Sequence, residues 1–342
     1  MTDWQDRLRK VDVILLATTM SLVMFGLLVL YSIGDGSIKK QAVWVVVGLI
    51  VMTAAALFNY NTLRHYTLII YSVNIFFLMV IAVMGKVALG AQRWIQIGAF
   101  SFQPSELSKI MVIITLGAYL AEKKGELHEW RDIMIAIAHI VPPLLLILFQ
   151  PDLGTALVLI AIMGGMLVAA GIKPKHMAVL SVAAYLMVAL AIRWHLLQAY
   201  QMKRLMVFIN PSSDPLGSGY NLRQSMIAIG SGGIFGKGLF SGTQSRLDFL
   251  PAAVKHTDFI FAVVGEELGF IGAASVLALF FFIITRVMGI AVSARSHFGL
   301  MIAAGIGSMW IFQVLVNIGM TIGIMPVTGI PLPFMSYGGS SM

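Results

Sequence analysis

The sequence predicts an all-α fold in which one integral membrane domain, residues 1–342, crosses a bilayer many times. Hydrophobic residues make up 59% of the chain and charged residues only 11%, with a mean hydropathy of +0.91, whereas a soluble domain carries about 25% charged residues. Apolar runs of about 18 residues or more, long enough to cross a hydrocarbon core of ~30 Å as helices, recur along the chain. Cysteine is absent, which excludes disulfides and thiolate metal sites.

Nine apolar segments predict nine spans, with bounds that hold to within a few residues. The first span is too long for the apolar region of a cleavable signal peptide, and no small-residue cleavage site follows it. The predicted spans are residues 12–33, 42–57, 66–84, 104–121, 133–149, 153–170, 176–192, 259–285 and 298–322.

The basic residues predict the topology. With a cytoplasmic N-terminus, eleven Lys and Arg residues fall in inside segments and four in short outside loops, which is the asymmetry of the positive-inside rule. The net charge of +8 and the pI near 9.7 are therefore explained by helix orientation. We expect no nucleic acid partner.

A long extracytoplasmic loop, residues 193–258, is predicted between the seventh and eighth spans. It carries seven further basic residues, and long loops cross membranes largely regardless of charge. Its apolar residues recur at helical spacing from Tyr200 to Ile209, which predicts a short interfacial helix. Loops of this length without structure are uncommon unless they are functional, so we expect an ordered element.

Carboxylates gather in "VKHTDFIFAVVGEELGFIG", residues 254–272. Composition alone favours Asp258 as a helix N-cap, shared with Thr257, while a carboxylate beside His256 at a membrane surface also suits general acid–base chemistry. Both readings stay open on the pattern alone. Residues 268–285 are long enough to span by themselves, so Glu266 and Glu267 are expected in a protein-lined cleft, with at least one of them paired to a basic loop residue.

A charged pair lies at the start of the fourth span, in "QPSELSKIMV". Pro104 suits the first turn of a helix, and the spacing of Glu106 and Lys109 places both on one helix face, where they can pair. Charges within a span usually face an internal cavity. A structural ion pair and a substrate-lining pair both remain open.

Other polar motifs have competing interpretations. In "GAQRWIQIG", Trp94 suits an interfacial anchor and Arg93 suits a bidentate phosphate contact. The stretch "IGSGGIFGKG" fails as a Walker A motif because Ser231 and Gly238 stand where Gly and Ser or Thr are needed. Its glycine-rich turn and Lys237 could still hold a lipid diphosphate.

Two further patterns point to structure rather than chemistry. Asp152 in "FQPDLG" lies in a tight turn between two spans and is predicted to cap the following helix. The seven His residues are scattered without metal-ligand spacing, so we expect no dedicated transition-metal site.

Six long stretches together resemble the shape, elongation, division and sporulation (SEDS) family of bacterial membrane proteins. They run in the family's order from about residue 90 to the end of the sequence, and "GTQSRLDFLP" is closer to the elongation members than to the division members. The stretches are "GAQRWIQIG", "FQPSELSK", "QPDLGTA", "DPLGSGYNLRQSMIAIGSGGIFGKGL", "FLPAAVKHTDFIFAVVGEELGFIG" and "NIGMTIGIMPVTGIPLPFMSYGGSS".

The resemblance implies a peptidoglycan glycosyltransferase that polymerises lipid II on the outer face of the bacterial cytoplasmic (inner) membrane. Such an enzyme extends a growing glycan strand and releases undecaprenyl diphosphate. The resemblance further implies Asp258 as the essential carboxylate of "HTDFIFA", a divalent cation (Mg²⁺ or Mn²⁺), a class B penicillin-binding protein as partner, the elongation machinery, and surrounding membrane lipids. It also implies ten spans, whereas this sequence stops at Met342, before the tenth.

We therefore hypothesise that Asp258 is the general base toward the 4-hydroxyl of the acceptor sugar. Cationic groups would stabilise the leaving diphosphate. A lipid II flippase, which would depend on Glu106 and Lys109 more than on Asp258, and a non-catalytic scaffold for the transpeptidase remain alternatives. The candidate substrate-binding residues are Arg93, Trp94, Glu106, Lys109, Arg204, Arg223, Lys237 and His256.

Overall fold

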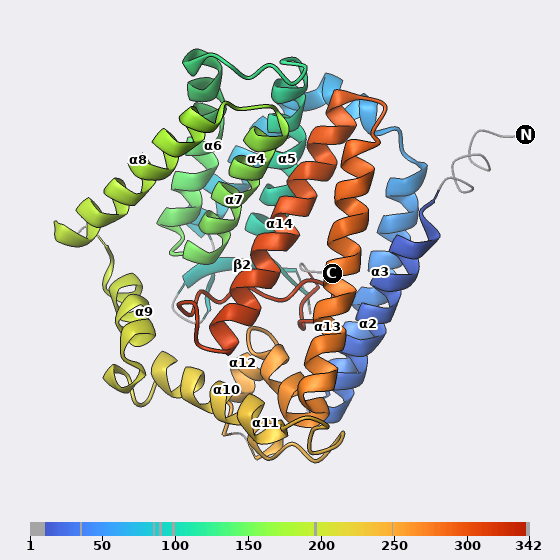
Figure 1. Ribbon diagram of the computed structural model, residues 1–342, viewed down its shortest axis with the longest axis vertical. Coiled ribbons are helices and arrows are strands. Elements are labelled where there is room, and N and C mark those ends of the chain that lie inside the picture. The colour runs from blue at the N-terminus through green and yellow to red at the C-terminus, as the bar shows by residue number, and fades with distance from the viewer. Residues whose placement is uncertain are drawn as a thin grey trace, which may run out of the picture. The chain divides into compact units, whose positions relative to one another are not determined.

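A computed structural model describes the backbone of residues 11–34, 36–84, 86–88, 91–97, 100–194, 197–247 and 249–339. It describes the side chains of these residues as well, except for those in 84–102 and 252–253. The described chain is predominantly helical (Figure 1), and the predicted fold class is confirmed. It forms two compact units, which we describe separately. Unit 1 comprises residues 1–59, 206–286 and 313–342, and unit 2 comprises residues 60–205 and 287–312.

Long apolar helices lie at the positions of the predicted spans. Eight helices in the described residues are long and apolar enough to cross a membrane, and α7 is a shorter apolar helix of 17 residues. The helices are α2 (Val13–Ile33), α3 (Ser37–Leu57), α4 (Thr67–Met84), α5 (Pro104–Ala121), α6 (Trp130–Phe149), α7 (Leu153–Ala169), α8 (Pro174–Arg193), α13 (Ile260–Val292) and α14 (His297–Thr321).

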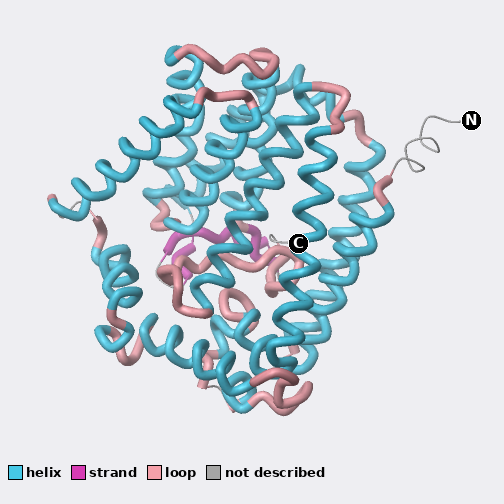
Figure 2. Tube along the Cα trace, in the orientation of Figure 1, coloured by secondary structure: helices cyan, strands magenta, loops and turns pink. Residues whose placement is uncertain are grey.

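Shorter elements fill the connections. A 3-10 turn, η1 (Tyr60–Tyr66), precedes α4, and a small antiparallel sheet follows it with strand order β1-β2-β3 (Figure 2). The strands are β1 (Lys86–Ala88), β2 (Ala91–Ile97) and β3 (Phe100–Phe102). No strand was predicted between the spans 66–84 and 104–121. Trp, Ile and Phe favour strands, and this signal was overlooked because each strand is short.

The described part of the long segment 193–258 is folded. It contains α9 (Ala199–Ile209), η2 (Pro211–Ser213), α10 (Ser218–Gly232), α11 (Thr243–Arg246) and α12 (Ala252–Lys255). The helix predicted from residue 200 to residue 209 is therefore confirmed as α9. The predicted order of this segment is confirmed as well, while its side of the membrane remains a prediction.

Small residues bring helices of unit 2 close together. A Cβ on Gly305 of α14 would lie 2.8 Å from Ile113 Cγ2 of α5 and 3.0 Å from Met166 Sδ of α7. Ile113 and Met166 are 1% and 0% exposed, so this contact lies in the core of the unit. In lipid, close packing of this kind replaces the hydrophobic drive that associates helices in water.

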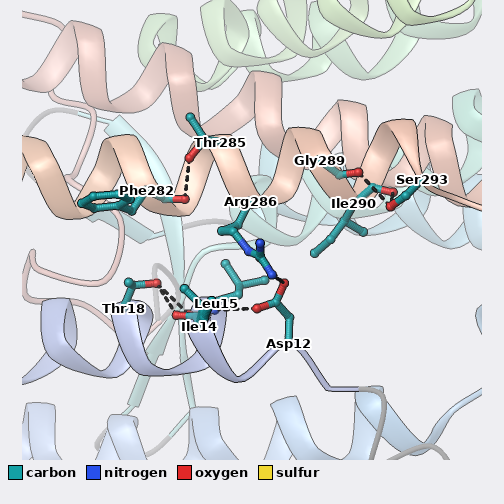
Figure 3. A network of polar contacts seen from close by, with 10 residues as sticks. All are labelled: Asp12, Ile14, Leu15, Thr18, Phe282, Thr285, Arg286, Gly289, Ile290 and Ser293. Carbon is teal, nitrogen blue, oxygen red and sulfur yellow. Dashed lines mark hydrogen bonds and ion pairs between the residues drawn. The ribbon is translucent and has the colours of Figure 1, made fainter.

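In unit 1, one carboxylate connects two helices (Figure 3). Asp12 is the N-cap of α2, and its Oδ1 accepts a hydrogen bond from the Leu15 amide at 3.0 Å. Its Oδ2 accepts from Arg286 of α13, through Nε at 3.0 Å and Nη2 at 2.6 Å. The Leu15 amide, opposed by desolvation and aided by the Arg286 guanidinium, lowers the pKa of the Asp12 carboxyl from its usual 3.8.

Helix α13 is interrupted at Gly269, whose φ of 65° and ψ of −160° are not helical. The interruption frees backbone groups, and residues 233–238 pair with them. The amides of Lys237 and Gly238 donate to the carbonyls of Glu266 and Glu267 at 3.0 and 2.9 Å. In the other direction, the amides of residues 270 and 271 donate to the carbonyls of residues 233 and 234 at 2.9 and 3.2 Å.

Two neighbouring glycines of α7 provide a matched test of helix packing. A Cβ on Gly165 would overlap Ser308 Oγ and lie 2.5 Å from Ser308 Cβ, while one on Gly164 would meet nothing within 4 Å. We expect Gly165→Ala to lower the free energy of unfolding by about 1–3 kcal/mol through overpacking. Gly164→Ala should be neutral or slightly stabilising, because Ala favours helix. Unfolding in detergent measures both, and equal effects would contradict the packing assigned to unit 2.

The Asp12 contact predicts a pH-dependent stability. Because the pKa of this carboxyl is lowered on folding, its stabilisation is present above the unfolded pKa and is lost as the pH falls through the folded pKa. Asp12→Asn keeps a capping side chain and should cost about 0.5–1 kcal/mol near pH 7, a value limited by solvent exposure of the pair. The difference from wild type should shrink as the pH falls below 3.8. An unfolding series that shows the same difference at pH 3 and pH 7 would refute it.

Candidate functional site

The segment that carries Asp258 connects α12 to α13 in unit 1, and the C-terminal part of the chain holds its backbone. The Tyr337 amide donates to the His256 carbonyl at 2.8 Å. The Ser336 hydroxyl donates to the Thr257 carbonyl at 2.6 Å. Ser336 Oγ also accepts from the Leu332 amide at 2.8 Å, so the loop that supplies these donors is itself braced.

Asn317 of α14 makes a further connection to the same segment. Its Nδ2 donates to the carbonyl of Asp258 at 3.0 Å and to that of Ile330 at 2.8 Å. The side chain is fully buried. One amide group therefore fixes Asp258 relative to both α14 and the C-terminal loop.

Behind this loop, Gln41 of α3 contacts its backbone twice. Gln41 Nε2 donates to the Ser336 carbonyl at 3.3 Å, and Gln41 Oε1 accepts from the Gly338 amide at 3.1 Å. Gln41 is 1% exposed although it belongs to an otherwise exposed helix. Sequence reasoning missed both Asn317 and Gln41. A polar amide within an apolar span was the available signal.

Asp258 is half-buried and lies two residues before α13, which begins at Ile260. The capping interpretation of Asp258 stays a prediction. The ring of His256 lies 5.2 Å from that of Tyr337 in an edge-to-face arrangement. Asp258 and His256 lie in one turn of the backbone, and their part in acid–base chemistry stays a prediction.

Glu266 lies in a dense set of hydrogen bonds at the interrupted part of α13. Its Oε1 accepts from Lys237 Nζ at 2.8 Å and from the Gln244 amide at 2.8 Å, and its Oε2 accepts from the Ser245 amide at 3.1 Å. Thr243 Oγ1 adds a contact at 3.1 Å. The prediction that one Glu pairs with a basic loop residue is confirmed.

The glycine-rich turn is occupied by these same contacts. Lys237 Nζ donates to Glu266 and Thr243, and the amides of Lys237 and Gly238 donate to α13 carbonyls. A Cβ on Gly236 would also collide with the backbone at Glu267. The glycines therefore permit close approach of two backbones. A diphosphate contact through Lys237 stays a prediction.

The charged pair at the start of α5 is confirmed in unit 2. Lys109 Nζ lies 2.7 Å from Glu106 Oε2, and the two side chains are only 4% and 13% exposed.

Asp152 is confirmed as the N-cap of α7, where it accepts from the Thr155 amide at 3.2 Å. Asp152 also accepts from Gln103 Nε2 at 3.0 Å, a link from α7 to the start of α5 that the sequence did not predict.

The other predicted residues make different contacts or lie outside the described side chains. In unit 2, the Arg204 guanidinium lies over the Tyr200 ring at 5.8 Å. In unit 1, Arg223 Nη2 donates to Ser212 Oγ at 3.4 Å in an exposed contact. Arg93 and Trp94 belong to β2, and their side chains lie outside the described residues.

Unit 2 also contains a cleft of about 720 Å³ that sequence analysis did not anticipate. His139 lines it, with Nε2 at 2.9 Å from Thr115 Oγ1, and the Tyr71 hydroxyl donates to the His139 carbonyl at 2.9 Å. None of the predicted site residues belongs to its lining. Histidines spread over different spans gave no local motif by which to find it.

The divalent cation has no ready-made site beside Asp258. Within the ranges that the structure describes, no three His, Cys, Asp or Glu side chains gather closely enough to hold a metal ion. Asp258 could supply one oxygen ligand, and the other ligands would have to come from elsewhere. The cation therefore stays a prediction.

Comparison with known proteins gives matches along almost the whole chain. Peptidoglycan glycosyltransferase MrdB of Escherichia coli K12 is 38% identical over 338 residues, covering 97% of this chain and 89% of the relative. Stage V sporulation protein E of Bacillus subtilis is 36% identical over 348 residues, covering 97% and 93%. A probable peptidoglycan glycosyltransferase FtsW of Trichlorobacter lovleyi is 36% identical over 355 residues, covering 98% and 90%.

Solved structures agree with these matches. A chain from a peptidoglycan synthase complex that coordinates polymerization and crosslinking superposes with a TM-score of 0.84 at 29% identity, covering 97% of this chain and 94% of that one. The rod shape determining protein RodA of Thermus thermophilus superposes with a TM-score of 0.73 at 26% identity, covering 97% and 92%.

The profile of the cell cycle protein family, which unites FtsW, RodA and SpoVE, matches residues 9–342. With this profile, the relatives and the apolar helices in agreement, the chain is a multi-pass membrane protein that belongs to the FtsW/RodA/SpoVE family of cell cycle proteins.

Proposed function

We propose that this peptidoglycan glycosyltransferase polymerises lipid II on the outer face of the bacterial cytoplasmic membrane during cell-wall elongation, with Asp258 as its general base. The observation that carries the proposal is the fixed backbone around Asp258. Three successive carbonyls, at residues 256 to 258, each accept a hydrogen bond from α14 or the C-terminal loop. Irregular backbone at membrane depth is expected where it lines a cavity or is buried in protein.

In the proposed reaction, Asp258 takes the proton from the 4-hydroxyl of the acceptor GlcNAc. The freed oxygen forms a bond to the anomeric carbon of the donor sugar, and the bond from that carbon to the diphosphate oxygen breaks. The electron pair leaves with undecaprenyl diphosphate. A half-buried carboxylate suits this role, because a positioned carboxylate can accept the proton of a reacting hydroxyl in the transition state.

The leaving diphosphate needs positive charge as it departs. His256 lies two residues before Asp258 in the same turn, and Arg223 is a further cationic candidate in unit 1. A bound divalent cation would supply the same neutralisation.

The contacts of Asn317 would hold Asp258 in a fixed position. A general base must lie within hydrogen-bonding distance of the proton that it removes, and a displacement of about 1 Å can cost about 10²-fold in rate. The Asn317 amide holds the carbonyl of Asp258 at 3.0 Å. Asn317 is thus proposed as a positioning residue rather than a group that contacts substrate.

Orientation and partners follow from the same proposal. The distribution of basic residues supports a cytoplasmic N-terminus, with segment 193–258 and the active site outside. A class B penicillin-binding protein is the proposed partner, supported by the structural likeness to a chain of a peptidoglycan synthase complex. The likeness to MrdB and to a rod shape determining protein supports association with the elongation machinery.

Replacement of Asp258 tests the base directly. We expect Asp258→Asn to lower the rate of glycan polymerisation by about 10²–10⁴-fold, because general-base assistance is removed. The measurement is a gel assay of strands made from lipid II by the detergent-solubilised protein, with and without the class B partner. The control is Glu126→Gln, an exposed carboxylate in the 121–130 connection. A flippase only moves lipid II from one face of a bilayer to the other, so in detergent it would yield no glycan strands. A scaffold would tolerate the loss of Asp258.

Replacement of Asn317 tests the positioning role. Asn317→Ala leaves two carbonyls without their donor, so we expect kcat to fall about 10–100-fold with little change in KM for lipid II. The matched control is Asn74→Ala, because Asn74 is also buried in an apolar helix but its Nδ2 has no partner among the described residues. Equal losses of kcat in the two variants, or a change confined to KM, would refute the assignment.

A further inference from the structure

The cleft of unit 2 lies at one end of the spans that form it. Residues of η1, α4, α5 and α6 line it, together with Glu122, the C-cap of α5. Its volume of about 720 Å³ lies within the range of small-molecule sites. Glu106 stands in the first turn of α5, so the cleft and the Glu106–Lys109 pair are at opposite ends of one span, about 24 Å apart at a rise of about 1.5 Å per residue.

The lining of this cleft borders both an aqueous and an apolar surface. Arg64 and Glu122 form its rim, with 47% and 63% of their side chains exposed. Leu68, another lining residue, is 77% exposed and belongs to an apolar span. Tyr71 and Tyr119 also line the cleft, and tyrosine gathers where membrane meets water. A ligand with a charged headgroup and an apolar tail would meet both surfaces at once.

Two ion pairs near this end of α5 differ in tightness. Lys123 Nζ lies 2.7 Å from Asp132 Oδ1, and these side chains are 29% and 15% exposed. Arg64 Nη2 lies 3.4 Å from Glu122 Oε1, which is long for a charge-assisted hydrogen bond. An exposed pair of this kind contributes little to stability. The rim therefore presents one cation and one carboxylate that can each take a better partner.

The tyrosine hydroxyls of the lining have already used their protons. The Tyr71 hydroxyl donates to the His139 carbonyl at 2.9 Å, and the Tyr119 hydroxyl donates to the Asp132 carbonyl at 3.2 Å. A phenolic hydroxyl can both donate and accept, so each of these oxygens keeps its capacity to accept but has no proton left to donate. The two rings also offer faces that attract a cation. Both features favour a ligand that brings a positively charged N–H donor.

A zwitterionic headgroup matches this distribution of groups. A phosphate suits Arg64, because guanidinium groups bind phosphate oxygens through two hydrogen bonds, and a primary ammonium suits Glu122 and the tyrosine oxygens. A headgroup with phosphate alone would bring its negative charge beside Glu122 without compensation. A trimethylated ammonium has no N–H with which to donate.

We propose that the unit 2 cleft binds the headgroup of a membrane phospholipid that carries a phosphate and a primary ammonium. The phosphate lies at Arg64, and the ammonium lies between Glu122 and the tyrosine oxygens. The lipid thus replaces one long Arg64–Glu122 contact by a separate partner for each charge. This site does not depend on the proposed reaction, and only its assignment to the cytoplasmic leaflet follows from the proposed orientation.

Lipid binding to the delipidated full chain in detergent tests the proposal without an activity assay. The probes are phosphatidylethanolamine, phosphatidylcholine and phosphatidylglycerol with identical acyl chains, and native mass spectrometry measures the bound fraction as each is titrated. We expect phosphatidylethanolamine to bind about tenfold more tightly than the other two, the effect of one hydrogen bond to a charged group. Glycerophosphoethanolamine, the headgroup without acyl chains, should bind far more weakly because it buries no apolar tail.

Substitutions at the rim separate the two charges. Both positions are exposed, so neither substitution should unfold the protein. Arg64→Gln should weaken phosphatidylethanolamine binding about tenfold. Glu122→Gln should abolish the preference, so that phosphatidylglycerol binds as tightly as phosphatidylethanolamine. The matched controls, Lys124→Gln and Glu126→Gln, change exposed charges of the same connection outside the cleft lining and should keep the wild-type preference.

Several outcomes would overturn the proposal. The wild type could bind the three lipids equally, or could bind phosphatidylglycerol or phosphatidylcholine most tightly. Arg64→Gln could leave phosphatidylethanolamine binding unchanged, or Glu122→Gln could keep the preference. Binding of glycerophosphoethanolamine as tight as that of the lipid would identify a soluble ligand instead. An equal loss of preference in the control variants would assign it to surface charge in general.

Discussion

The interruption of α13 at Gly269 is the constraint on which much of unit 1 depends. In hydrocarbon no water is available to satisfy a broken helix, so the freed amides and carbonyls must find partners in the protein. Residues 233–238 supply those partners through hydrogen bonds of 2.9 to 3.2 Å in both directions. Such an approach of two backbones is possible because glycines occupy the crossing, where a Cβ on Gly236 or Gly269 would collide with the opposite chain.

The interruption also determines where charge is buried. Because the backbone of residues 233–238 is held against α13, Lys237 reaches Glu266 and the loop of residues 243–245 closes over that carboxylate. A glycine-rich sequence that suggested phosphate binding is thereby used for packing. The Lys237 side chain remains 26% exposed, so solvent reaches one partner of this ion pair.

The backbone around Asp258 follows the same rule. Residues 256–258 are not helical, and their carbonyls are paired with a side-chain amide, a hydroxyl and a backbone amide contributed by residues 317, 336 and 337. In unit 2, Asp152 similarly caps α7 and accepts from Gln103 at the start of α5. In both units, polar groups that an apolar medium cannot solvate are bound by residues distant in sequence, which gives these turns a defined geometry.

Local sequence patterns were enough to predict the helices and several contacts of this protein. Hydropathy alone located every long helix, the spacing of Glu106 and Lys109 predicted their 2.7 Å contact, and the turn around Asp152 predicted a helix cap. Each of these depends on neighbouring residues and on the period of a helix. Six motifs in order indicated the family, and the profile match over residues 9–342 confirmed it.

Tertiary structure decided the rest, because the partners are far apart in the chain. Asn317 was found to hold the Asp258 carbonyl across 59 residues. Sequence could not show which of Glu266 and Glu267 is paired, since both stand in the same apolar run. Only the fold reveals that the amides of residues 244 and 245 and the Lys237 ammonium surround Glu266, as each hydrogen bond depends on where a distant backbone comes to lie.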